Sequence, residues 1–317
     1  MSNSPPLPSD EPAPGNGVNR RNFLRTSAVL TSGLAALAAS LAPLRELDEF
    51  PSMEQFLQKY YRELTPAEKE KVLKRIADEV EREYGVRPKV RDPQAMDGVE
   101  FVYALNLTRC VGCRKCVHAC VAENNLSRNP EIQYIRVVRL PHGSLDLEKA
   151  EHNYDPEMVP EEGFFYMPIQ CQQCENPPCV KVCPVHATWQ EPDGITVIDY
   201  DWCIGCRYCA AACPYWARHF NFKRPSIPKE RLNPDMAYLG NRPRRKGVME
   251  KCHFCVQRTR AGRYPACLEA CPVGARKFGN VLDPESEVAY ILRTKRVFIQ
   301  LKEEVGTSPR FFYYFDV

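Results

Sequence analysis

The sequence has little of several features that would assign it to a common class. Lys and Arg number 43 against 40 Asp and Glu, and a net charge of +3 lacks the basic excess of a nucleic-acid-binding protein. Cysteine makes up 16 of the 317 residues, or about 5 %, which is less than the cysteine share of roughly 8–10 % typical of a disulfide scaffold. After residue 44 no segment is apolar enough to cross a bilayer. The sequence contains no recognisable nucleophile–base constellation and no phosphate-binding loop, so an independent enzyme lacks support.

The first 42 residues are typical of an export signal. Arg20 and Arg21 precede a stretch without charge at residues 26–44, which is dominated by small and apolar residues and ends in a run suited to a signal peptidase. We therefore expect a twin-arginine signal over residues 1–42, which exports the folded protein to the periplasm or the outer face of the cytoplasmic membrane. The alternative is a weak membrane anchor, because the uncharged stretch approaches the roughly 20 residues that span a bilayer.

Residues 43–98 are predicted to form a helical spacer. Thr65, Pro66 and Glu68 have the pattern of a capping box with proline in the first turn, so a helix should begin there. Apolar residues then recur at four-residue spacing, and Gly85 supplies a stop. An earlier short helix is expected over residues 53–61. The pair is either a docking element for a partner or a hairpin packed against its own domain.

All the cysteines fall into four groups of four. Groups two to four are followed directly by proline, whereas group one has Val121 at that position. In order, the groups are Cys110, Cys113, Cys116 and Cys120; Cys171, Cys174, Cys179 and Cys183; Cys203, Cys206, Cys209 and Cys213; and Cys252, Cys255, Cys267 and Cys271.

The C-x2-C-x2-C-x3-C-P pattern is that of bacterial ferredoxins, in which the fourth cysteine ligates the other cluster of a two-cluster unit. Gly112 and Gly205 lie within such loops, where we expect the backbone to approach the inorganic sulfides closely. The sequence therefore predicts four 4Fe-4S clusters whose irons are bound by the sixteen cysteines. Disulfides would join close neighbours at awkward geometry, and zinc at group four is the remaining alternative because that group superficially resembles paired zinc knuckles.

Groups two and three are separated by a short segment that contains Pro192, Asp193 and Gly194 between two β-rich runs. This turn signal predicts a hairpin, so groups two and three should form one compact two-cluster unit. Group one then pairs with group four by elimination. The predicted ligand sets are Cys110, Cys113, Cys116 and Cys271; Cys171, Cys174, Cys179 and Cys213; Cys203, Cys206, Cys209 and Cys183; and Cys252, Cys255, Cys267 and Cys120.

The expected fold is α+β, with two bacterial-ferredoxin-like two-cluster units, one inserted in the other, and an N-terminal helical extension. Unit A comprises residues 99–164 and 223–282, which carry groups one and four. Unit B comprises residues 165–222, which carry groups two and three. Residues 283–317 are expected to form a C-terminal tail.

From residue 101 onward the sequence resembles the four-cluster iron-sulfur subunits of the molybdopterin oxidoreductase superfamily. The resemblance is carried by residues 116–125 (CVHACVAENN), 170–179 (QCQQCENPPC), 199–209 (DYDWCIGCRYC), 212–215 (ACPY) and 251–255 (KCHFC). With its own export signal, the chain looks most like the exported subunits that partner polytopic quinone-interacting membrane proteins. The stretch 44–97 has no counterpart that we recognise in this resemblance.

The resemblance implies a non-catalytic electron-transfer subunit that is peripheral at the membrane. It would relay single electrons through four clusters between a quinone-interacting membrane subunit and an extracytoplasmic partner, either a molybdopterin catalytic subunit or a cytochrome c. The alternative is a structural or assembly subunit of a membrane respiratory complex, whose clusters mainly hold the fold.

Other residues near the cysteines are open to more than one interpretation. The four histidines could tune or ligate a cluster, or be packed or solvated. The arginines of the group-four loop could guide a partner, raise a nearby cluster potential, or be simply solvated. The tryptophans are expected to shield clusters from water. These residues are His118, His186, His219, His253, Arg258, Arg260, Arg263, Trp189, Trp202 and Trp216.

Overall fold

The computed structural model describes residues 64–295 and 298–316. The expected export signal at 1–42 and the short helix at 53–61 therefore lie outside the described residues. Within the described part of the chain, no helix combines the length and the apolar character needed to span a membrane.

Helix α3 (Pro66–Tyr84) begins where the capping pattern predicts it. The Thr65 hydroxyl accepts the backbone N–H of Glu68, and the Glu68 carboxylate accepts the backbone N–H of Thr65 at 3.0 Å. The helix ends at Gly85, which has a φ of 65° and donates its N–H to the Glu81 carbonyl. Both ends are thus set by local sequence, which confirms this part of the prediction.

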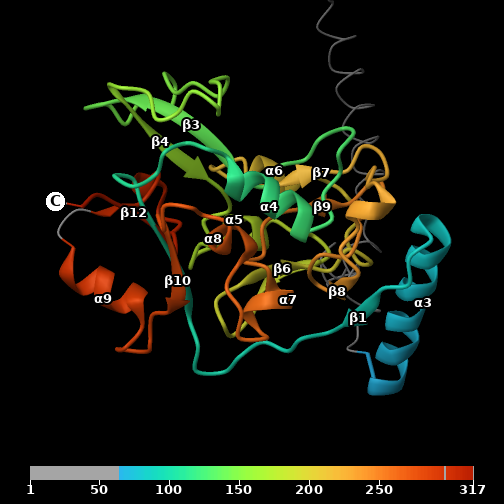
Figure 1. The fold of residues 1–317 in the computed structure, drawn as a ribbon. Coiled ribbons are helices and arrows are strands. Elements are labelled where there is room, and N and C mark those ends of the chain that lie inside the picture. Colours follow the sequence, from blue (N-terminus) through green and yellow to red (C-terminus); the bar gives the residue numbers. More distant parts are fainter. Residues whose placement is uncertain (1–63, 296–297, 317) are drawn as a thin grey trace, which may run out of the picture. The chain divides into compact units, whose positions relative to one another are not determined.

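The apolar face of α3 packs against the same chain. Ile76 and Val80 are buried in a cluster with Ile227, Leu232 and Met236. After the helix, strand β1 (Lys89–Arg91) pairs in parallel with β8 (Asp235–Ala237), so α3, β1 and β8 lie together in Figure 1. The interpretation of α3 as an element packed on its own domain therefore has support, and its apolar face is not free to dock a partner.

A four-stranded sheet joins three distant parts of the sequence. Strand β2 (Phe101–Asn106) is buried throughout and pairs antiparallel with β10 (Arg276–Asn280) and parallel with β12 (Phe311–Tyr314). Strand β11 (Phe298–Ile299) completes the order β10-β2-β12-β11. The C-terminal segment, expected only as a tail, thus contributes an inner strand, and helix α9 (Glu287–Thr294) packs beside this sheet (Figure 1).

The remaining strands form three two-stranded antiparallel pairs. The predicted hairpin is present: β5 (Thr188–Gln190) and β6 (Thr196–Ile198) pair antiparallel around a turn in which Gly194 has a φ of 80°. The other antiparallel pairs are β3 (Arg136–Pro141) with β4 (Phe164–Ile169), and β7 (His219–Phe220) with β9 (Met249–Glu250).

Short helices carry the third cysteine of each group. They are α4 (Lys115–Glu123) with Cys116, α5 (Pro178–Lys181) with Cys179, α6 (Tyr208–Ala211) with Cys209, and α8 (Ala266–Glu269) with Cys267. The other short elements are α7 (Val256–Thr259) and two 3-10 turns at Lys229–Arg231 and Glu303–Val305. Apart from α3, the described fold is therefore a mixture of short helices and strands in which the cysteine loops lead directly into helices.

Candidate metal centres

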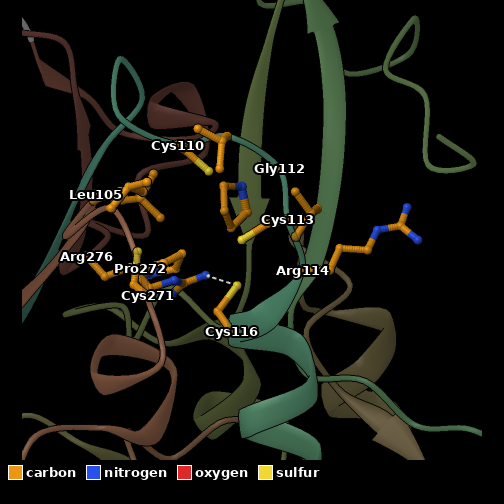
Figure 2. Close-up of a pocket in the computed structure, with 14 residues that line it drawn as sticks. Leu105, Cys110, Gly112, Cys113, Arg114, Cys116, Cys271, Pro272 and Arg276 are labelled. Carbon is orange, nitrogen blue, oxygen red and sulfur yellow. Dashed lines mark hydrogen bonds between the residues drawn. The ribbon is translucent and has the colours of Figure 1, made fainter. Parts of the chain in front are cut away.

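The first cavity is lined by the first three cysteines of group one and the last of group four. Cys110, Cys113, Cys116 and Cys271 all border it, with their side chains facing the same space in Figure 2. Arg276 reaches into this site from β10 and donates from Nη2 to the Cys116 Sγ at 3.3 Å. These are the four cysteines that the sequence predicts for one ligand set.

Two further cavities each border four cysteines from groups two and three. One is lined by Cys171, Cys174, Cys179 and Cys213, and the other by Cys183, Cys203, Cys206 and Cys209. Arg218 lines both, so the two cavities are neighbours that share one wall. In each case the fourth cysteine comes from the other group of the pair, as in the predicted sets.

The fourth set is packed into the interior. Cys120, Cys252, Cys255 and Cys267 are all buried, and Cys120 lies close enough to the other three to interact electrostatically with each. Asn124 directs its amide nitrogen to the Cys120 Sγ at 3.5 Å and to the Cys255 Sγ at 3.6 Å.

The donor sets fit 4Fe-4S clusters. All sixteen cysteines are free, so their sulfurs are available as ligands. Among the described residues, no three His, Cys, Asp or Glu side chains converge closely enough to hold a single metal ion. Hydrogen-bond donors on the sulfurs are a further feature of iron-sulfur sites.

Burial governs the acidity of these thiols. It raises the pKa of Cys110 to about 12, although the backbone N–H of Gly112 opposes the effect. Burial likewise raises the pKa of Cys174 to about 12 and those of Cys120 and Cys252 well above the usual value. Without iron these thiols are protonated at neutral pH, so cluster binding releases protons.

Contacts within the protein require glycine at two positions of the cysteine loops. Gly112 and Gly205 have φ values of 75° and 70°, in the left-handed region that favours glycine. A Cβ at Gly112 would lie 2.3 Å from the Tyr166 ring, and one at Gly205 would lie 2.0 Å from the Gly247 carbonyl oxygen. Packing within the protein therefore excludes a side chain at both positions.

The histidines near the cysteines are packed or exposed. His253 is buried and accepts the Val256 N–H at Nδ1, and burial holds its pKa well below the usual range. His219 stacks on Tyr134, with ring centroids 5.9 Å apart. His118 and His186 are exposed.

Two of the group-four arginines are buried in ion pairs, whereas guiding a partner and simple solvation both require an exposed side chain. Arg258 lies 3.0 Å from Glu123, and Arg260 lies 2.8 Å from Asp193. Arg263 is exposed. Arg258 and Arg260 therefore hold the loop to the rest of the domain, and an effect on a nearby cluster potential stays a prediction.

The shielding role expected of the tryptophans is wrong for Trp216, which is 67 % exposed. Trp189 and Trp202 are half-buried, and the Trp202 indole donates to the Val185 carbonyl at 2.5 Å.

Several residues that contact cysteine sulfurs were not expected from the sequence. Arg218, Arg276 and Asn124 each direct a side-chain nitrogen to a sulfur. A signal for the arginines was present, because each follows the last cysteine of its group at the same spacing in C-P-x-x-A-R.

Comparison with known proteins identifies the cysteine-rich region. Two models described as a 4Fe-4S dicluster domain match, one over residues 109–187 and the other over residues 163–232 and 236–281. Together they span all four cysteine groups.

Relatives extend the similarity beyond that region. The chain is 34 % identical over 310 residues to a selenate reductase subunit of Mesobacillus selenatarsenatis, covering 93 % of this chain and 96 % of that protein. It is 40 % identical to the Hdr-like menaquinol oxidoreductase iron-sulfur subunit 1 of Archaeoglobus fulgidus, over 67 % of this chain and 82 % of that one. It is 36 % identical to a tetrathionate reductase subunit of Salmonella typhimurium, over 67 % and 71 %.

The match to the selenate reductase subunit covers 93 % of this chain, so it cannot leave out the whole stretch 44–97. Contrary to expectation, that stretch therefore has a counterpart in this relative. The chain belongs to the iron-sulfur subunits of the molybdopterin oxidoreductases, electron-transfer proteins in which two dicluster domains with sixteen cysteines carry four 4Fe-4S clusters.

Proposed function

We propose that this chain relays electrons one at a time between a quinone-interacting membrane subunit and an extracytoplasmic redox partner. The observation that carries the proposal is the sharing of one wall, at Arg218, by two cavities that each gather four cysteines. Adjacent redox groups at such sites would let an electron pass through the protein. When bound, each 4Fe-4S cluster accepts and returns one electron.

The ligands of each cluster are the four sets predicted from the sequence. Each of three sets lines its own cavity, and the four cysteines of the fourth set are buried close to one another, which supports this assignment. Pairing of β2 with β10 ties residues 99–164 to residues 223–282 across the intervening chain. It supports a unit A into which unit B, residues 165–222, is inserted, preceded by a spacer at 43–98.

One site has an exposed edge at which a partner could exchange electrons. Cys206 is the only one of the sixteen cysteines that is exposed. Around it, the side chains of Ile204, Tyr208 and Phe222 are 58 %, 63 % and 63 % exposed. Such an apolar patch is typical of a protein contact.

The surroundings of this edge are basic. Arg207 lies over the Phe222 ring, Lys223 follows that residue, and Lys246 precedes Gly247, whose carbonyl oxygen lies against Gly205. No ion pair is formed by these three cations within the described residues. We therefore place the contact with an acidic surface of a protein redox partner here.

The remaining assignments follow from the relatives and the N-terminal sequence. Two relatives are named a menaquinol oxidoreductase subunit and a menaquinone reductase subunit, which supports a quinone-interacting membrane partner. The opposite partner is a molybdopterin catalytic subunit or a cytochrome c. Export by the twin-arginine signal places the chain at the outer face of the cytoplasmic membrane, where it is peripheral. Changing Arg20 and Arg21 to lysine should retain the protein in the cytoplasm, and unchanged export would contradict the signal.

The ligand sets are tested by pairs of variants compared by electron paramagnetic resonance. Cys271→Ser and Cys113→Ser should alter the same cluster signal, because both residues border one cavity. Cys120→Ser and Cys255→Ser should alter a different one. If Cys271→Ser instead changes the signal that Cys255→Ser changes, the exchange of fourth cysteines is wrong.

Electron relay is tested with the loaded full chain on membranes that contain its partner. Quinol should reduce the clusters, and addition of the terminal acceptor should reoxidise them within turnover, as followed by visible absorbance. Clusters that remain unchanged would favour the structural role. Mild detergent extraction, followed by identification of the co-purifying subunits, names the donor and acceptor.

A matched pair of tyrosines tests the exposed edge. Tyr208→Glu places an acid beside Cys206, whereas Tyr290→Glu makes the same change on α9 at a side chain of similar exposure, 60 % against 63 %. Tyr208→Glu should slow electron exchange several-fold and Tyr290→Glu should not. Equal rates in both variants would remove the partner contact from this edge.

A further inference from the structure

Two buried arginines occupy equivalent places in the two halves of the cysteine-rich region. Each ends the sequence C-P-x-x-A-R that begins at the last cysteine of its group, Cys213 for Arg218 and Cys271 for Arg276. Arg218 is 7 % exposed and Arg276 is 2 % exposed. A guanidinium remains charged when buried, so each site holds a fixed positive charge in the interior.

Arg218 lies between the two cavities of groups two and three. Its Nη2 donates to the Cys179 Sγ at 3.0 Å and to the Thr188 hydroxyl at 2.9 Å. It borders the cavity of Cys179 and also that of Cys209. Its Nε and Nη1 are buried without a hydrogen-bond partner among the described residues. Such unpaired donors are costly unless an acceptor is bound beside them.

Arg276 has the corresponding position between groups one and four. Its Nη2 donates to the Cys116 Sγ at 3.3 Å in the first cavity (Figure 2). Its Nη1 donates to the Tyr103 hydroxyl at 3.3 Å, and that hydroxyl lies 3.4 Å from the Cys267 Sγ. Arg276 thus contacts one set directly and the other through Tyr103.

The correspondence extends to the cysteine that each arginine touches. Cys179 and Cys116 are both the third cysteine of the first group in their pair. Each arginine also attracts the third cysteine of the second group, Cys209 for Arg218 and Cys267 for Arg276. A buried positive charge therefore lies near cysteines of both sets in each pair.

Neither arginine is neutralised by a carboxylate. The hydrogen bonds of Arg218 and Arg276 within the described residues go to sulfur, hydroxyl and amide groups. Arg258 and Arg260, by contrast, are paired with Glu and Asp. A buried charge needs a counter-charge, and here the cysteine thiolates are the anionic groups at hand.

We propose that Arg218 and Arg276 each raise the reduction potentials of both clusters in their pair. The inference rests on the ligand sets of the proposed function. A reduced cluster carries one more negative charge than an oxidised one, so a fixed cation near the ligands of two clusters stabilises the reduced form of both. The two potentials of a pair are thereby kept high together, which favours electron passage within the pair.

The test is a redox titration of the loaded full chain, monitored by electron paramagnetic resonance. Arg218→Gln should lower two of the four midpoint potentials, and Arg276→Gln should lower the other two. We expect the equilibrium constant for reduction to fall about tenfold at each affected cluster, which is ~59 mV for one electron. The lysine variants retain the charge and should restore most of the loss. Arg263→Gln, at an exposed position of the group-four loop, is the control and should change no potential.

Several results would overturn the inference. Unchanged potentials in Arg218→Gln with full iron content would do so, as would a shift confined to one cluster or spread over all four. If the glutamine variants fail to load, Arg218→Lys and Arg276→Lys provide the test. Each lysine variant should shift only its own two potentials, by less than the ~59 mV that corresponds to a tenfold change in the equilibrium constant. Loss of electron exchange with quinol, with these shifts present, would contradict the proposed function and leave the role of the arginines standing.

Discussion

Gly205 packs directly against Gly247, whose carbonyl oxygen lies 2.0 Å from the place that a Cβ of residue 205 would occupy. Gly205 lies between Cys203 and Cys206, so the contact fixes the loop that carries the exposed edge of group three. A backbone oxygen cannot move aside as a flexible side chain can. The contact therefore couples the group-three loop to the segment before β9.

Gly205→Ala should displace this loop and prevent the group-three site from loading. The φ of 70° adds strain of roughly 1–2 kcal/mol to the steric overlap. Iron content and visible absorbance should fall by about the share of one cluster, measured on anaerobically purified protein. Gly143→Ala has a similar φ of 82° but meets nothing within 4 Å, so it should load fully. Equal loading in both variants would show that the contact with Gly247 is unimportant.

A buried ion pair lies behind the fourth set of cysteines. Arg244 Nε is 3.0 Å from Glu250 Oε2, and both side chains are at most 1 % exposed. Arg244 also donates to the Asn124 carbonyl at 2.6 Å, and Asn124 contacts Cys120. Arg244→Leu would leave Glu250 as an unpaired buried charge, so it should lower the free energy of unfolding by about 3–5 kcal/mol.

Denaturant unfolding under anaerobic conditions measures this loss. The control is Arg75→Leu, which removes a 2.8 Å pair with Asp201 in which the arginine side chain is 52 % exposed. Exposed pairs contribute about 1 kcal/mol or less. A loss in Arg244→Leu no larger than that of the control would mean that the buried pair contributes little.

What could be predicted from the sequence follows from how local each signal is. The capping box at Thr65 and the turn at Gly194 are set by neighbouring residues, and both are found as expected. The cysteine sets could be predicted because ferredoxin spacing carries the exchange of the fourth cysteine. Strand β12 could not, because Phe311–Tyr314 finds its partner β2 far away in the sequence. The role of Arg276 likewise depends on Tyr103, which lies on a distant strand.

Iron removal should expose the cysteines in an order set by their burial. Cys206 is exposed, whereas Cys252, Cys255 and Cys267 are buried. A thiol reagent added to the iron-free chain should therefore label Cys206 first, as read by peptide mass mapping. Reloading with iron and sulfide before labelling should protect it. Equally fast labelling of Cys252 would mean that the iron-free chain does not keep this structure.

His219 should make stability depend on pH below neutrality. Burial, with a contribution from Arg136, lowers the pKa of its imidazole, although Glu250 opposes the shift. The imidazole therefore binds a proton less readily in the folded chain than in the unfolded chain, where its pKa is about 6.5. The stability is fully present above that pH and is lost as the pH falls below it, by at most about 1.4 kcal/mol per pH unit. Denaturant unfolding of the loaded chain between about pH 8 and 5.5 should show this decline. His219→Gln should make it shallower, whereas His118→Gln, at an exposed position, should not. A decline that is unchanged in His219→Gln would assign the proton to another group.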